Sequence, residues 1–255
     1  MDFSLVFLSF GVGMLIGLTS VGGAALMTPI LILILGVRPV VAVGTDLAYT
    51  SVTKIMGAWA HWRQGTADVR LALRLARTSV PAGLLGVWLL GEIRKRGYDA
   101  DVFLRKALGV ALILAAALMI FRLPRKRPMN FLHPRAVWLR KWGAPFWAGF
   151  TGFSVGLTSV GSGSLLAPFL LLLYPQSTAR LIGTDVLHAA LLVTSTAAVH
   201  LYTGHVNWAM MPMLLFGSIP GVLLGARLSP HMPVQALRLG IAGLLVFSGY
   251  RLLSI

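Results

Sequence analysis

The hydrophobic positions of the chain gather into ten apolar stretches that are separated by short polar or basic segments. Runs such as "VALILAAALMIF" and "LLAPFLLLLY" recur along the whole length. About 20 mostly apolar residues let a helix cross ~30 Å of hydrocarbon, so the pattern predicts an all-α, polytopic helical membrane protein. The stretches cover residues 3–17, 24–36, 42–60, 70–90, 102–122, 143–157, 163–174, 180–202, 207–228 and 234–254.

Composition and charge agree with this class. The 255 residues are 57% hydrophobic and 11% charged, whereas soluble domains carry about 25% charged residues. The formal net charge is +15, but Lys and Arg lie mainly between the apolar stretches, where they would flank membrane spans, so nucleic acid is not an expected partner. The chain has no Cys, which excludes disulfides and cysteine-ligated metal. The start "MDFSLVFLSF" lacks a basic region and an A-x-A-like cleavage site, so it is interpreted as a first membrane segment.

One sequence unit occurs twice. The phrase "GLTSVGGAALMTPI" starts at Gly17 and "GLTSVGSGSLLAPF" starts at Gly156, 139 positions later. The same offset relates "VGTD" to "IGTD", His61 to His200 and many positions beyond. A constant offset over such a length indicates an internal duplication, which is common in transporters. The sequence therefore predicts a first transmembrane repeat at 1–121, a basic cytoplasmic linker at 122–141 and a second transmembrane repeat at 142–255.

The first two stretches of each copy are short, and they meet at the glycine-rich phrase. They form either one broken crossing or a re-entrant hairpin, since non-helical backbone at membrane depth must be buried in protein or line a cavity. With hairpins, three full crossings remain per copy and the two repeats insert with opposite orientation. The basic loop around Arg63–Arg77 then lies in the cytoplasm and the loop near His205 lies outside. The basic loop Arg94–Lys106 is then placed outside, although basic loops are usually cytoplasmic. Inverted repeats are favoured.

The glycine-rich phrases are the predicted binding site. Glycine lets a helix stop and restart, and a restarted helix presents unpaired N–H groups and the positive end of its dipole to an anion. The alternative is that small residues merely allow close helix packing. A phosphate loop is excluded because neither phrase ends in G-K-[ST]. The predicted substrate-binding residues are Thr19, Ser20, Gly22, Gly23, Thr158, Ser159, Gly161, Ser162 and Gly163.

Two acids lie in apolar sequence at equivalent positions, Asp46 and Asp185, each preceded by a threonine, Thr45 or Thr184. An intramembrane carboxylate usually faces a cavity or a partner, so each could carry a proton or bind a coupling cation. The alternative is that Gly-Thr-Asp begins a helix and caps its first turn.

Four further side chains are secondary candidates. Lys54 could attract an anion or pair with Asp46, against the alternative of a snorkelling side chain. Histidines titrate near neutrality, but those at helix ends suit an ordinary interfacial role equally well. No metal-ligand cluster or nucleophile–base pair has recognisable spacing, so no metal, cofactor or enzymatic activity is expected. The histidine candidates are His61, His188 and His200.

The doubled "GLTSVGG…P" and "GTD" phrases, the basic linker and the chain length resemble the sulfite exporter TauE/SafE family of bacterial membrane proteins. The resemblance implies a secondary transporter in the inner or plasma membrane that exports sulfur-containing anions, such as sulfite or sulfoacetate, with a passive anion channel as the alternative. It carries over to Gly17–Gly23 with Pro29, Gly44–Asp46, Gly156–Gly163 with Pro168, and Gly183–Asp185. The expected partners are the anion and the lipid bilayer; proton coupling and a homodimer are left open.

Overall fold

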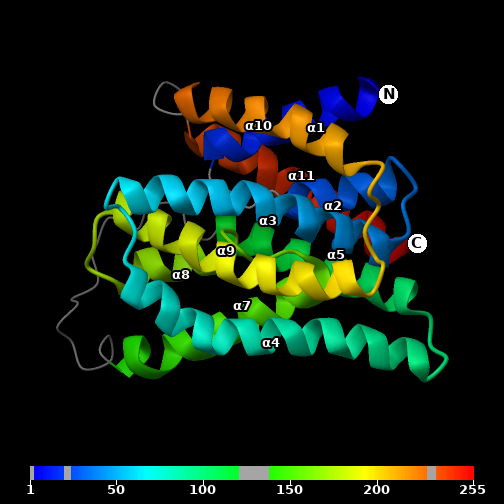
Figure 1. Cartoon of the computed structure of the whole chain (residues 1–255), viewed down its shortest axis with the longest axis horizontal. Helices are drawn as coiled ribbons and strands as arrows, with labels where there is room; N and C mark the ends of the chain where they lie inside the picture. The colour runs from blue at the N-terminus through cyan, green and yellow to red at the C-terminus, as the bar shows by residue number, and fades with distance from the viewer. Residues whose placement is uncertain (1–2, 20–23, 121–137, 229–233) are drawn as a thin grey trace.

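The computed structural model describes residues 3–19, 24–120, 138–228 and 234–255, which contain helices and no strand. The all-α class is therefore confirmed. The two repeats each supply five α-helices, and a short π-helical segment, η1, precedes the second set (Figure 1). The helices are α1 Phe3–Thr19, α2 Ala24–Leu33, α3 Pro39–Arg63, α4 Val69–Lys95, α5 Ala100–Ile120, η1 Leu139–Gly143, α7 Ala144–Thr158, α8 Leu166–Leu173, α9 Thr178–Tyr202, α10 Met211–Leu228 and α11 Val234–Ser254.

The third helix of each repeat begins earlier than its apolar stretch. Pro39 occupies the first turn of α3, where a missing N–H costs nothing, and the side chain of Ser177 caps α9 by accepting a hydrogen bond from the Arg180 N–H. Asp46 and Asp185 consequently lie inside these helices and not at their first turns. The alternative that the Gly-Thr-Asp phrases begin these helices and cap their first turns is therefore wrong.

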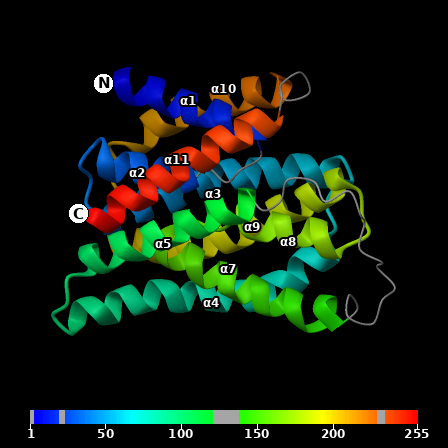
Figure 2. The ribbon, with the colours of Figure 1, turned by 180° about the vertical axis from the view of Figure 1, so that it is seen from behind.

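The two repeats exchange helices. The first helix of each repeat packs along the fourth helix of the other, which gives the pairs α1–α10 and α4–α7 (Figure 2). Glycines allow this close approach: a Cβ at Gly156 would fall on the carbonyl oxygen of Gly83, and one at Gly225 on that of Met14. Small residues at helix contacts let backbones approach closely in membranes. The alternative role proposed for small residues, helix packing, thus applies to Gly156.

The helices α3 and α9 pack against each other in opposite directions at the centre of the molecule. The hydroxyl of Thr45, near the start of α3, accepts a hydrogen bond of 2.9 Å from the N–H of Asn207, beyond the end of α9. The equivalent bond, also 2.9 Å, runs from the N–H of Asp68, beyond the end of α3, to the hydroxyl of Thr184. The same contact is thus made twice, at the two ends of the pair.

The loop that follows α3 is also held by the carboxylate of Asp68, which caps α4 by accepting a hydrogen bond from the Leu71 N–H. The same carboxylate accepts a bond from the side chain of Gln176 in the second repeat. Burial alone would raise the pKa of Asp68, but these hydrogen bonds and the nearby Arg180 lower it below its usual value. The ionised carboxylate of Asp68 therefore links the α3–α4 turn to the segment before α9 by hydrogen bonds.

In the second repeat, α8 doubles back along α7. The indole N–H of Trp147, in the first turn of α7, donates a hydrogen bond of 2.9 Å to the carbonyl of Leu165, just before α8. The rings of Trp147 and Phe169 stack with centroids 5.5 Å apart. Of the two alternatives for the glycine-rich phrase, the second repeat adopts the hairpin; the corresponding turn of the first repeat lies outside the described residues.

The outward helix faces are apolar. Phe7, Trp88, Phe146 and Phe216 are each at least 60% exposed, as expected for surfaces that contact lipid. Two helices, α5 and α9, are long and apolar enough by themselves to cross a membrane.

Candidate functional site

The turn between α7 and α8 is an interior break in helical structure. Ser159 ends α7 with a φ of 63°, in the left-handed region that few residues other than glycine adopt. Gly161 and Gly163 follow with φ values of 145° and 86°. All of residues 158–166 are buried. Gly161 and Gly163 are therefore required by the backbone conformation of a buried turn.

The turn between α7 and α8 places one hydroxyl beside a carboxylate of the other repeat. The Ser159 hydroxyl donates a hydrogen bond of 2.6 Å to Oδ2 of Asp46, which also accepts one of 2.9 Å from Thr28. The Thr50 hydroxyl, one turn further along α3, lies 3.5 Å from Oδ1. Asp46 is fully buried, and hydroxyl donors of this kind stabilise a carboxylate that has lost its water. The structure thus joins two predicted site residues, Asp46 and Ser159.

Two other hydroxyls of the break have no hydrogen-bond partner. Ser162 and Ser164 are 1% and 7% exposed, and their Oγ atoms are buried and unpaired. Thr158, in contrast, donates to the carbonyl of Ser154 within its own helix. An unmade hydrogen bond in a buried place costs about 1–3 kcal/mol, which a bound polar ligand would recover. Ser162 and Ser164 are therefore the available donors of this turn, although only Ser162 was predicted.

The second acid has different surroundings. Asp185, on α9, is 4% exposed, and its Oδ1 has no hydrogen-bond partner. Lys54 of α3 interacts with it electrostatically, without forming a direct ion pair between the described residues. His188, one turn after Asp185, has its Nε2 2.7 Å from the Ser79 hydroxyl of α4, while its Nδ1 is buried and unpaired. The possibility that Lys54 pairs with Asp46 is wrong, because the donors to Asp46 are hydroxyls and no ion pair joins it to Lys54 among the described residues.

The two acids lie towards opposite ends of the α3–α9 pair, because Thr45 contacts the loop after α9 and Thr184 the loop after α3. They form two separate polar clusters and not one. Four of the nine predicted binding residues have no described side chain. Ser20, Gly22, Gly23 and the side chain of Thr19 lie outside the described residues.

The predicted histidines at the helix ends differ from each other. His61 is half-buried, and its Nδ1 lies 2.9 Å from the Thr66 hydroxyl. His200 is 1% exposed with both ring nitrogens unpaired, so it is not an ordinary interfacial residue. Its ring centroid lies 5.8 Å from that of His205. No group of three or more His, Asp or Glu side chains that could hold a metal occurs in the described ranges.

Three residues of the clusters were not predicted: Thr28, Thr50 and Ser79. Thr50 could have been found, because it lies four residues after Asp46 on the same helix face. Thr28 and Ser79 come from other helices, and no local signal connects them to Asp46 or His188.

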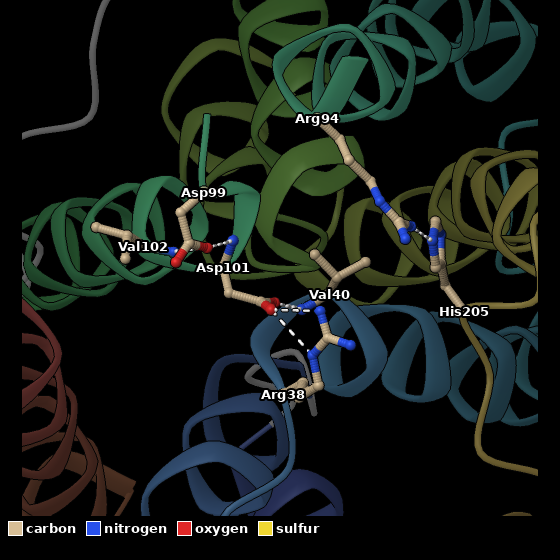
Figure 3. A network of polar contacts seen from close by, with 7 residues as sticks. All are labelled: Arg38, Val40, Arg94, Asp99, Asp101, Val102 and His205. Atoms are coloured by element: carbon tan, nitrogen blue, oxygen red, sulfur yellow. Dashed lines mark hydrogen bonds and ion pairs between the residues drawn. The ribbon is translucent and has the colours of Figure 1, made fainter. Parts of the chain in front are cut away.

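A network of polar contacts joins the start of α3 to the start of α5 (Figure 3). Asp101, in the first turn of α5, accepts hydrogen bonds from the Arg38 guanidinium at 2.9 and 3.1 Å and from the Val40 N–H at 3.0 Å. Beside it, the guanidinium of Arg94 lies 3.5 Å from Nε2 of His205 in the second repeat. Burial and the positive charge of Arg94 lower the pKa of His205 below its ordinary value.

The all-helical fold with a buried, broken-helix turn places the chain among helical membrane transporters. The family "Sulfite exporter TauE/SafE" matches residues 5–252, and the chain belongs to this family.

The chain is 38% identical over 260 residues to "Probable membrane transporter protein YjnA" of Bacillus subtilis (strain 168), covering 99% of this chain and 100% of that protein. It is 25% identical to "Probable membrane transporter protein YdhB" of the same organism, over 93% and 94% of the two chains. A "Probable membrane transporter protein" of Xylella fastidiosa (strain Temecula1 / ATCC 700964) is 28% identical over 87% of this chain and 82% of its own length. No solved structure matches.

Proposed function

We propose that this protein is a secondary transporter of the inner or plasma membrane that exports sulfur-containing anions, such as sulfite or organosulfonates, by alternating access between two inverted halves. The family name supports the substrate class. The exchanged pairs α1–α10 and α4–α7, together with the antiparallel α3–α9 contact, support the inverted halves, because equivalent helices would then cross in opposite directions.

The observation that carries the proposal is the buried turn at 158–166. It combines backbone that has left the helix with two buried hydroxyls, on Ser162 and Ser164, that lack partners. Such turns line the binding sites of transporters, where freed N–H groups and hydroxyls replace the hydration shell of an anion. The duplicate phrase at 17–23 would supply the other half of the site, and Asp46 or Asp185 would couple the anion to a proton.

Uptake and efflux of sulfite in proteoliposomes test this function. A carrier that uses a proton gradient moves sulfite uphill when a pH gradient is imposed, whereas a passive channel only dissipates a sulfite gradient. Sulfate, thiosulfate, sulfoacetate and simple carboxylates, screened by thermal shift, define the substrate class.

A matched pair of variants localises the site. Gly161→Leu places a large side chain where the backbone has a positive φ and Val155 lies close, so transport should be lost. Gly240→Leu, at a position with nothing within 4 Å of an added Cβ, is the control and should transport normally. Normal flux through Gly161→Leu would contradict the proposed site.

A further inference from the structure

The two buried acids occupy equivalent positions in the repeats but have different hydrogen-bond donors. Asp46 accepts from three hydroxyls, whereas Oδ1 of Asp185 has no partner. The sequence explains the difference, since two of the three donor positions are alanine in the second repeat. The donors are Thr28, Thr50 and Ser159, and the first two correspond to Ala167 and Ala189.

Lys54 of α3 lies near Asp185 in place of those hydroxyls. Gly57, three residues after Lys54, packs so closely on α9 that an added Cβ would lie 3.2 Å from the side chain of Val186, the neighbour of Asp185. Lys54 lies on the same face of α3 as Thr50 and Ala58, both buried, because each is four residues away. No direct ion pair joins its ammonium to Asp185 among the described residues. The equivalent residue in the second repeat is Val193, so this charge has no counterpart beside Asp46.

His188 completes this group, which we call the lysine cluster: Lys54, Asp185, His188 and Ser79. His188 lies on the same face of α9 as Asp185, and the unpaired Nδ1 could accept or release a proton. The ionisable groups that interact with Lys54 from the described elements are Asp185 and His188 of α9 and His61 of its own helix. One cation therefore faces one acid and two histidines.

The partly buried ammonium of Lys54 and the buried carboxylate of Asp185 tolerate each other because their charges offset each other. An anion that binds the ammonium of Lys54 breaks this balance and leaves a net negative charge in a place of low dielectric constant. Proton uptake by the Asp185 carboxylate removes that excess. We propose that the lysine cluster is the coupling site of the transporter and a second contact for the anion, beyond the turn at 158–166. A sulfonate or sulfite oxygen binds the ammonium of Lys54, whose charge then no longer offsets that of Asp185, and Asp185 takes up one proton.

This inference rests on the proposed function and makes it more specific. It assigns coupling to Asp185 and not to Asp46, which its three hydroxyl donors hold as a structural carboxylate. It also means that the anion and the proton bind together and cross in the same direction. Export then runs down the gradient of the anion itself.

The test is isothermal titration of the full-length protein with sulfoacetate, whose charge is constant between about pH 6 and about pH 8, where sulfite itself titrates. Titrations in two buffers of different ionisation heat count the protons taken up. The wild type should take up about one proton per anion, and its Kd should fall by up to about tenfold per unit decrease in pH. Asp185→Asn should bind with no proton uptake and no pH dependence.

Control variants distinguish a specific role of the lysine cluster from general effects on folding or on surface charge. Lys54→Gln should lose binding, Lys54→Arg should retain both binding and proton uptake, and Asp46→Asn should still take up the proton. Arg251→Gln removes an exposed positive charge elsewhere and should bind as the wild type. Asp185→Glu keeps an ionisable group and should restore proton uptake if Asp185→Asn folds poorly.

Two results would overturn this inference alone: proton uptake that persists in Asp185→Asn, or wild-type binding by Lys54→Gln. Both leave the proposed function intact. If the wild type bound none of the sulfur-containing anions, the proposed function would be contradicted, and with it the role assigned to the cluster.

Discussion

At the residue scale, one turn contains two serines with opposite roles. Ser159 donates to the buried carboxylate of Asp46, so its hydroxyl belongs to the folded structure. Ser162 is equally buried but has no partner, so its hydroxyl is available to a ligand. Their residue type is the same, and only the geometry distinguishes them.

This difference predicts opposite effects of removing each hydroxyl. Ser159→Ala should lower stability by about 1–3 kcal/mol, because a buried carboxylate loses a donor. Ser162→Ala should leave the melting temperature nearly unchanged and weaken sulfite binding about tenfold or more, since a hydrogen bond to a charged group contributes about 1.5–3 kcal/mol. Thermal unfolding followed by tryptophan fluorescence, with titration of sulfite, measures both. Equal effects of the two variants on binding would contradict the assignment.

At the element scale, glycines set how closely the exchanged helices pack. A Cβ at Gly156 would meet the backbone of Gly83 on α4, and backbone atoms cannot move aside as side chains do. The α4–α7 contact therefore depends on a missing methyl group. Gly91, further along α4, has nothing within 4 Å of an added Cβ.

We expect Gly156→Ala to destabilise the protein by about 1–3 kcal/mol, as overpacking usually does. Gly91→Ala is the matched control and should be neutral or stabilising by up to about 1 kcal/mol, because alanine favours the helix. The test compares the melting temperatures of the two purified variants with that of the wild type. A stable Gly156→Ala protein would show that α4 and α7 separate without cost.

The elements were largely predictable from the sequence, and their partners were not. Ten apolar stretches predicted the ten α-helices of the described residues, since a helix satisfies its own backbone hydrogen bonds and needs apolar side chains where it contacts lipid. Pro39, a residue that favours the first turn of a helix, marks the true start of α3. The apolar stretch alone did not show this start, because apolar residues lie on both sides of it. The antiparallel contact of α3 with α9 depends on hydrogen bonds between residues more than 100 positions apart, which no local pattern encodes.

The candidate site was predictable in its duplicated residues and not in its differences. A repeat comparison singles out Asp46, Asp185 and both glycine-rich phrases because they occur twice. It passes over Thr28 and Thr50 because their counterparts are alanines. Those unmatched positions are the ones that give the two acids different environments.

At the scale of the whole molecule, the antiparallel α3–α9 pair places equivalent loops at opposite ends. Gln64 and Thr203 are equivalent exposed residues, each directly after the third helix of its repeat. In a membrane crossed by inverted halves, one of them faces the cytoplasm and the other the outside. The basic sequence around Arg63–Arg77 favours the cytoplasm for Gln64.

The chain has no native cysteine, so single cysteines can be labelled without background. A membrane-impermeant maleimide should label Thr203→Cys in intact cells and label Gln64→Cys only after the cells are opened. Labelling of both from outside, or of neither, would contradict the inverted arrangement. Expression is checked in each case by labelling in detergent.

The helix exchange also has a consequence for the origin and assembly of the molecule. A polypeptide of half this length would have no partner for its own first and fourth helices. In two such polypeptides, one inserted upside down relative to the other, the first helix of each would pack on the fourth helix of the other. A gene cut within 122–141 should therefore yield two fragments that complement when they are produced together and are degraded when produced apart.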